Sequence, residues 1–181
     1  MYVINLFGAP CSGKSTLAAK LFYTLKEADL STEYVYEYAK EIIYESRNDI
    51  LSNDQLYIFA KQHRKLNRLI NNTDYAICDS PLLLSNIYFN KNSNIYSWEL
   101  FELFVLDTFS KYNNLNFLLN CPDKKYYNNV GRNKLYNESV KIHNDIKEYL
   151  IKHKIKYFEI SWDNGINIIC DALKIKNLSI R

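Results

Sequence analysis

The strongest constraint on this chain is a glycine-rich segment close to its first residue. Gly8 and Gly13, two of only four glycines, open and close a G-x-x-x-x-G-K-S pattern that directly follows the apolar run 2–7. The pattern needs a strand before it and a helix after it, and residues 15–26 provide a helix-like stretch. The glycines permit a tight turn whose backbone N–H groups, with the helix N-terminus, point at phosphate oxygens. We therefore expect a nucleoside triphosphate to bind here; the alternative is a simple glycine turn before a helix.

The side chains of this loop have expected roles in binding ATP and Mg²⁺. Lys14 is expected to reach the β- and γ-phosphates, and the Ser15 hydroxyl to ligate the Mg²⁺ that bridges them. The other ATP-binding positions of the loop are Gly8, Ala9, Pro10, Cys11, Ser12, Gly13 and Thr16. ATP and Mg²⁺ are therefore the predicted cofactors.

Length and composition indicate one globular unit and exclude little else. A chain of 181 residues corresponds to about one domain, so we expect a single domain over residues 1–181. The net charge of +3 is too small to indicate a nucleic-acid-binding protein. No stretch of 18 uninterrupted apolar residues occurs, and a basic N-terminal region is missing. We expect no membrane partner and a cytoplasmic location, where Cys11, Cys78, Cys121 and Cys170 stay reduced.

Apolar runs alternate with helix-like stretches along the chain. Strands are expected at 2–7, 33–37, 75–78, 116–120 and 157–160. Helices are expected at 14–28, 38–46, 53–70 (with Ser52 or Asn53 as the cap), 82–89, 97–111, 138–153 and 165–175. This order predicts an α/β fold with a five-stranded doubly wound parallel sheet and helices on both faces. Ligands in such a fold bind at the carboxyl ends of the strands.

Two carboxylates lie at predicted strand ends and are candidates for chemistry. Asp79 follows a buried strand and suits Mg²⁺ coordination, directly or through water; the alternative is an N-cap, a role for which Ser80 competes. Glu37 is the candidate general base for an acceptor hydroxyl; the alternative is an acidic residue that favours the dipole of the next helix. Ser80 is a candidate substrate-binding residue.

Two basic groups are further candidates. Arg64 and Arg68 are four residues apart on one face of the predicted helix 53–70, where they can grip an acceptor; the alternative is an ordinary solvated face. Residues 121–137 lack periodicity and carry several cations, which is typical of a lid. Arg132, beside Gly131, is the residue we expect to stabilise transition-state charge, and the alternative is an exposed loop.

Several segments together resemble the small P-loop kinase-type ATPases that are common in bacteriophage genomes. The segments are 7–16, 32–40, 54–62, 78–84 and 129–133, and the likeness extends over about residues 2–150. That group is related to nicotinamide riboside kinase domains and includes phage kinases that phosphorylate 5-hydroxymethyluracil in DNA. In that group positions 9 and 11 are often glycine, whereas this chain has Ala9 and Cys11, so we expect a stiffer loop that still binds ATP.

The resemblance implies a nucleoside/nucleotide kinase-like core in which Glu37 faces the acceptor and Arg132 faces ATP. The predicted function is a Mg·ATP-dependent kinase that phosphorylates a nucleoside-type hydroxyl, with 5-hydroxymethyluracil in phage DNA as the favoured acceptor. One alternative is a deoxynucleoside monophosphate kinase, which needs an acceptor-phosphate grip from Arg47, Arg64 or Arg68. Another is a regulatory ATP-binding module without catalysis. Expected partners are a nucleoside, nucleotide or modified-base DNA acceptor in the host cytoplasm, and a second copy of the chain in a homodimer.

Overall fold

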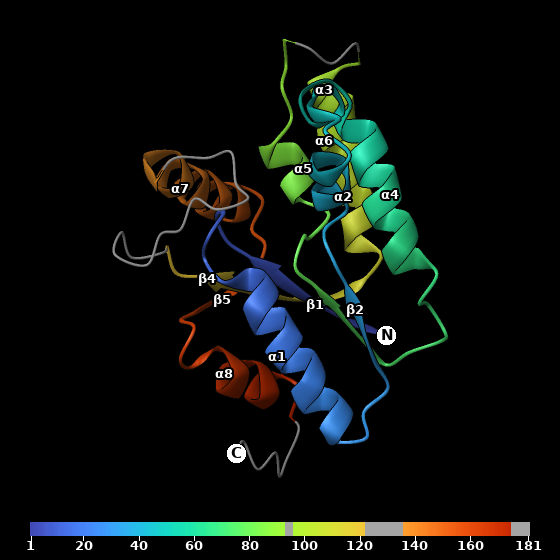
Figure 1. The fold of residues 1–181 in the computed structure, drawn as a ribbon, viewed down its shortest axis with the longest axis vertical. Coiled ribbons are helices and arrows are strands. Elements are labelled where there is room, and N and C mark those ends of the chain that lie inside the picture. Colours follow the sequence, from blue (N-terminus) through green and yellow to red (C-terminus); the bar gives the residue numbers. More distant parts are fainter. Residues whose placement is uncertain (93–95, 122–135, 175–181) are drawn as a thin grey trace.

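The computed structural model describes residues 1–92, 96–121 and 136–174 (Figure 1). Within these ranges the strands form one parallel sheet in the order β2-β3-β1-β4-β5. The strands are β1 (Tyr2–Phe7), β2 (Thr32–Val35), β3 (Tyr75–Cys78), β4 (Asn113–Leu119) and β5 (Phe158–Ile160). The predicted five-stranded doubly wound parallel sheet is confirmed.

Helices connect the strands and cover both faces of the sheet (Figure 1). They are α1 (Lys14–Glu27), α2 (Tyr38–Tyr44), α3 (Asn48–Asn53), α4 (Gln55–Asn67), α5 (Leu84–Ile87), α6 (Trp98–Ser110), α7 (Tyr136–Lys152) and α8 (Gly165–Ala172). None of the helices in the described ranges is long and apolar enough to cross a membrane.

The central strand β1 divides the core into two parts because its side chains alternate between the faces of the sheet. Val3 and Phe7 pack on the face covered by α4, α6 and α7. Ile4 and Leu6 pack on the opposite face with α1 and α8. All four side chains are buried. This packing fixes the carboxyl end of β1, and with it the loop that follows.

The predicted helix 53–70 corresponds to α4, which begins two residues later than predicted and is preceded by a separate short helix. The break is at Asp54, whose φ of −138° is not helical and whose carboxylate accepts a hydrogen bond of 2.9 Å from the backbone N–H of Tyr57. A carboxylate in this position satisfies a free N–H group of the first turn of α4. Residues 48–53 form their own short helix, α3, before this cap.

Strand β4 begins three residues earlier than predicted, in a segment that is polar in sequence. Asn114 and Asn116 accept hydrogen bonds of 2.8 and 3.0 Å from the side-chain amide of Asn5 in the neighbouring strand β1. These bonds satisfy the buried amides, so asparagine is tolerated inside the sheet.

Most of the predicted lid over 121–137, including Arg132, lies outside the described residues.

Candidate functional site

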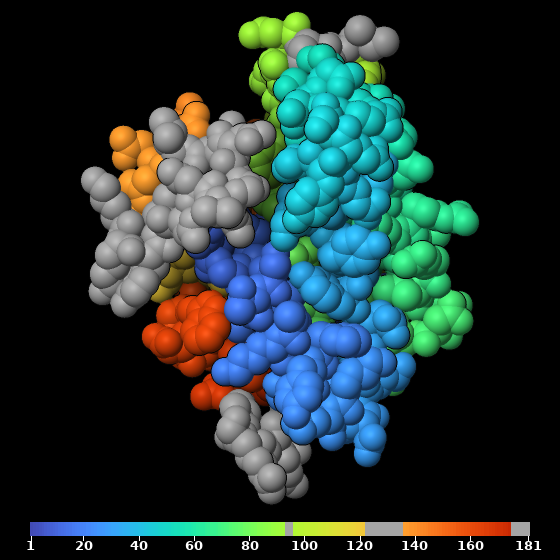
Figure 2. Space-filling view, viewed as in Figure 1, coloured from blue at the N-terminus to red at the C-terminus, as the bar shows by residue number. Residues whose placement is uncertain are grey.

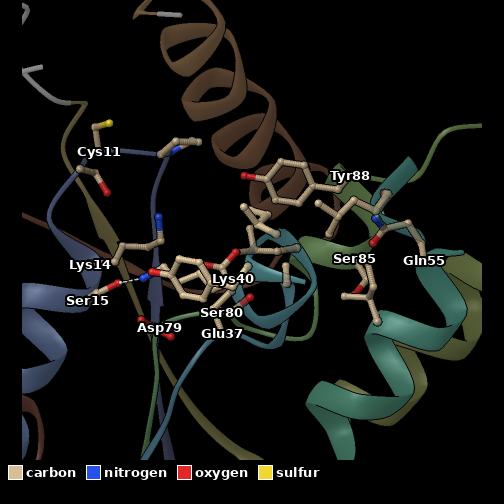
Figure 3. A pocket seen from close by; sticks show the side chains of 18 of the residues that line it. Cys11, Lys14, Ser15, Glu37, Lys40, Gln55, Asp79, Ser80, Ser85 and Tyr88 are labelled. Atoms are coloured by element: carbon tan, nitrogen blue, oxygen red, sulfur yellow. Dashed lines mark hydrogen bonds between the residues drawn. The ribbon is translucent and has the colours of Figure 1, made fainter. Parts of the chain in front are cut away.

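A cavity of about 730 Å³ opens at the carboxyl ends of β1, β2 and β3. The loop between β1 and α1 forms one wall, and residues of α2, α3, α4 and α5 form the other. In the space-filling view, the segment from α2 to α4 stands beside the N-terminal loop and helix (Figure 2). The close view shows Lys14 and Ser15 on the loop side, with Gln55, Ser85 and Tyr88 across the hollow (Figure 3).

Both glycines of the loop occupy positions that a side chain would disturb. Gly13 has a φ of +87° and is the N-cap of α1, without a side-chain hydrogen bond to the helix. A Cβ atom on Gly8, which has a φ of +154°, would lie 2.6 Å from Ser12 Oγ. Cys11 adopts a φ of +66°. This left-handed conformation is energetically unfavourable for any residue that has a side chain. The resulting turn directs the N-terminus of α1 at the cavity, where an anion is favoured.

Lys14 folds back over this loop. Its ammonium group donates hydrogen bonds to the carbonyl oxygens of Gly8, at 2.8 Å, and Ala9, at 2.9 Å. The ammonium therefore lies over the concave side of the loop, close to the position that a phosphate would take. Its flexible stem allows the ammonium group to exchange these carbonyl oxygens for the oxygens of an anion.

Asp79 and Ser15 provide oxygen ligands that fit Mg²⁺. Asp79 is 1% exposed, and its Oδ2 atom accepts a hydrogen bond of 2.6 Å from the Tyr34 hydroxyl. Its Oδ1 atom is buried and has no hydrogen-bond partner in the described part of the chain. A buried carboxylate oxygen without a partner is costly unless a cation or a donor completes it. The Ser15 hydroxyl lines the same cavity, and Mg²⁺ prefers this type of hard oxygen ligand.

Tyr34 links the two candidate metal ligands. Burial, followed by the hydrogen bond to Asp79, raises the pKa of Tyr34 far above its usual value, while a hydrogen bond with Ser15 acts in the opposite direction. The phenol therefore stays protonated and donates to Asp79. Within the described ranges, no group of three or more His, Cys, Asp or Glu side chains could hold a metal by itself. The remaining ligands of a Mg²⁺ ion would come from phosphate and water.

Glu37 lies in the cavity wall, two residues beyond the end of β2 and at the N-cap of α2. The wall across from it includes Tyr88, whose pKa is raised by burial and, secondarily, by the negative charge of Glu37. A group placed between the phosphate loop and Tyr88 would lie within reach of Glu37.

The structure adds two residues that the sequence analysis missed. Lys40 donates a hydrogen bond of 2.8 Å from its ammonium group to Ser15 Oγ. Trp162, between β5 and α8, packs on the loop so closely that a Cβ atom on Gly13 would lie 2.8 Å from its Cδ1 atom. A signal for Lys40 is present in the sequence, since it follows Glu37 by three residues on a helix. No comparable signal marks Trp162.

The predicted site residues divide into three groups. Most of them line the cavity together: Pro10, Cys11, Ser12, Gly13, Lys14, Ser15, Thr16, Glu37, Asp79 and Ser80, whereas Gly8 and Ala9 of the same loop are not among the lining residues. Arg64 on α4 and Arg68, the residue at its C-cap, are exposed and are not among the cavity-lining residues. Arg47, the further arginine considered for an acceptor grip, is paired with Glu45 at 3.4 Å outside the cavity. Arg132 lies outside the described residues.

Solved structures with the same fold include nucleoside and nucleotide kinases. NadR in complex with NR superposes with a TM-score of 0.74 at 16% identity, over 99% of this chain and 54% of that chain. A deoxyadenosine kinase from M. mycoides superposes with a TM-score of 0.58 at 15% identity, over 95% of this chain and 98% of that chain. For a thymidylate kinase from Ehrlichia chaffeensis the TM-score is 0.58 at 16% identity, over 97% and 98%. The chain spans about half the length of the NadR chains it matches.

These likenesses establish the fold as that of P-loop nucleotide kinases. Comparison with curated proteins gives no significant match. A family model described as "AAA domain" matches residues 3–165, which include the phosphate loop, Glu37 and Asp79. Since this match extends over most of the sequence, the chain belongs to that AAA domain family.

Proposed function

We propose that this protein is a Mg·ATP-dependent kinase that phosphorylates a hydroxyl group of a nucleoside-type acceptor. One observation carries the proposal: a single cavity brings together the phosphate loop, the buried carboxylate Asp79 and a second carboxylate, Glu37. A triphosphate held by the loop places its γ-phosphate between these groups. The part of the cavity beyond Glu37 is then the binding site for the acceptor.

The transfer needs little covalent chemistry from the protein. The acceptor oxygen bonds to the γ-phosphorus while the bond from that phosphorus to the β,γ-bridging oxygen breaks, and ADP leaves. Glu37 takes the proton of the acceptor hydroxyl. Lys14 holds the β- and γ-phosphate oxygens, and Ser15 and Asp79 would hold Mg²⁺, which neutralises the charge on these oxygens when bound. Because proton transfer is late in a loose transition state, the position of Glu37 matters more than a raised pKa.

The described lining favours an acceptor without a phosphate group. It contains two cationic side chains, Lys14 and Lys40, and both lie beside the triphosphate position. The acceptor wall instead has apolar and neutral polar side chains: Leu51, Gln55, Ile58, Leu84, Ser85 and Tyr88. Walls of this type suit a nucleobase and a sugar. This supports phosphorylation of a nucleoside hydroxyl over that of a nucleoside monophosphate.

The identity of the acceptor is a narrower proposal, which rests on the sequence resemblance. We favour 5-hydroxymethyluracil in phage DNA, with the protein acting in the host cytoplasm, alone or as a homodimer. The related fold of NadR, solved with NR, and of deoxyadenosine kinase supports nucleoside-type acceptors in general. A panel of acceptors separates these candidates.

The proposal is tested with ATP labelled at the γ-phosphate. Label is followed into hydroxymethyluracil DNA, deoxynucleosides, nucleoside monophosphates and nicotinamide riboside. Lys14→Ala is expected to abolish transfer, and Arg132→Ala to lower turnover. Incorporation into monophosphates alone would replace the nucleoside kinase by a nucleotide kinase. If label passes only to water, the kinase proposal is rejected in favour of a regulatory nucleotide-binding module.

Glu37 is tested against a matched carboxylate on the same strand-to-helix segment. Glu37→Gln is expected to keep the affinity for ATP and to slow transfer by a factor of about 10² or more. Glu33→Gln is the control, because Glu33 is exposed, pairs with Lys26 at 3.6 Å and lies outside the cavity lining. Normal turnover in the Glu37 variant would remove this residue from the mechanism.

A further inference from the structure

The cavity contains a second lysine that the phosphate-loop motif does not explain. Lys40 Nζ donates to Ser15 Oγ at 2.8 Å, and Figure 3 shows its side chain reaching from α2 to the loop. We propose that Lys40 is a further catalytic residue. Its ammonium group leaves Ser15 when Mg·ATP binds and contacts a γ-phosphate oxygen from the acceptor side, where it stabilises the charge of the transferring group. This inference rests on the proposed kinase function.

The position of Lys40 on α2 directs it to the transfer point. Glu37 is the N-cap of this helix, and Lys40 follows it by three residues, so both side chains lie on the same side of the first turn. Both line the cavity. The first turn of α2 therefore offers a carboxylate for the acceptor proton and an ammonium group for the phosphate charge.

Lys40 cannot keep its contact with Ser15 unchanged in the loaded site. The Ser15 oxygen accepts the hydrogen bond from Lys40 and is also the expected ligand of Mg²⁺. A divalent cation on this oxygen would face the ammonium group across a few ångströms, and the two positive charges repel each other. The lysine has a flexible four-carbon stem, whereas Ser15 is fixed in the first turn of α1. The ammonium group is therefore the part that moves.

The γ-phosphate is the anion that the ammonium group of Lys40 can contact after it leaves Ser15. In the described lining Lys14 and Lys40 are the cationic side chains, and they come from different walls of the cavity. Lys14 lies over the loop, where it contacts the Gly8 and Ala9 carbonyls. The charge of the transferring group spreads over three oxygens, so a cation on the acceptor side complements one on the loop side. Cations that are already in place when the charge develops give the largest stabilisation.

A purely structural role for Lys40 makes a different prediction about nucleotides. If Lys40 only held the Ser15 hydroxyl in place, its removal would affect ADP and ATP to the same extent, because both nucleotides use Ser15. A contact with the γ-phosphate affects the triphosphate alone. The ratio of the two affinities therefore separates the roles without any catalytic turnover.

The experiment measures binding of ADP and of the β,γ-imido analogue of ATP, both with Mg²⁺, by calorimetry. Lys40→Met is expected to weaken binding of the analogue about 10- to 100-fold more than that of ADP, the range for losing a charged hydrogen bond. Lys40→Arg should retain most of the preference for the triphosphate. Lys111→Met is the control, because Lys111 is 69% exposed and pairs with Asp107 outside the cavity. Thermal unfolding of each variant establishes that it is folded.

Two results would overturn the proposal. One is an equal loss of affinity for ADP and the analogue, or no loss, in folded Lys40→Met. The other concerns steady-state transfer, in which Lys40→Met is expected to lower kcat and to leave the KM of the acceptor unchanged. A raised acceptor KM with a normal kcat would instead assign Lys40 to binding of the acceptor. Failure of the kinase function is distinct, since wild-type protein would then transfer no label although the preference for the triphosphate is still measurable.

Discussion

The contact between Gly13 and Trp162 allows the strain in the phosphate loop to be measured. Gly13 has a φ of +87°, and a Cβ atom there would lie 2.8 Å from Trp162 Cδ1. A residue with a side chain in the left-handed region costs about 1–2 kcal/mol. Displacing the indole ring costs a further amount of about 1–2 kcal/mol, in the lower range for overpacking because the ring is 48% exposed. Gly13→Ala should therefore lower the free energy of unfolding by about 2–4 kcal/mol.

A double-mutant cycle separates the two contributions. In the Trp162→Ala background the ring is absent, so Gly13→Ala should cost only the backbone part, about 1–2 kcal/mol. The coupling between the two positions is then about 1–2 kcal/mol, well above the 0.5 kcal/mol scatter of independent sites. The measurement is urea unfolding of the four proteins of the cycle without nucleotide.

Two outcomes would refute this reasoning. If Gly13→Ala costs the same in both backgrounds, the indole ring does not press on the loop. If the cost is below about 0.5 kcal/mol in either background, the left-handed conformation of Gly13 is not required for folding. The expected result would establish that the segment after β5 supports the loop that binds phosphate.

The other predictions concern core packing, loop conformation and pH. Leu17→Ala should lower the unfolding free energy by about 2–5 kcal/mol in urea titrations, because Leu17 is fully buried under α8; a cost below about 1 kcal/mol would contradict this packing. Cys11→Gly should raise the unfolding free energy by about 0.5–1 kcal/mol, because glycine adopts a φ of +66° without strain. Because Cys11 lines the cavity, bound ATP should slow alkylation of the wild-type thiol. Equal alkylation rates with and without ATP would place the thiol away from the triphosphate. Burial lowers the pKa of His63 and of His143, so the unfolded chain binds more protons below about pH 6.5, and stability should fall as the pH drops below this value. Replacing both histidines by Asn should flatten this slope, and an unchanged slope would assign the acid sensitivity to other groups.

The parts of the site that were predicted from sequence are those with local causes. The phosphate loop needs two glycines at a fixed spacing, and Asp79 needs only a buried strand before it. The contact between Lys40 and Ser15 joins residues 25 positions apart and depends on where α2 packs. The contact of Trp162 with Gly13 depends on the order of strands in the sheet. Sequence patterns do not determine such distant placements.

The long helical stretch shows how a hydropathy pattern can be misread. Arg64 and Arg68 share a face because they are four residues apart, but their spacing does not tell which face. The buried face of α4 includes two amides, Gln55 and Gln62, and leaves Leu56 41% exposed. Burial on this helix therefore does not follow hydropathy alone, because two amides lie inside and a leucine lies outside. Arg64 and Arg68 lie in solvent.

Because α2 is short, the positions of Glu37 and Lys40 depend on a residue outside the cavity. A helix of seven residues is marginal by itself. Its first backbone N–H group, from Tyr38, donates to the buried side-chain oxygen of Gln62 at 2.9 Å. Gln62 is absent from the cavity lining, yet its amide anchors the turn that carries both Glu37 and Lys40. Changes at this glutamine are therefore expected to shift Glu37 and Lys40 together, and so to alter the proposed contacts with both the acceptor and the γ-phosphate from a position outside the cavity.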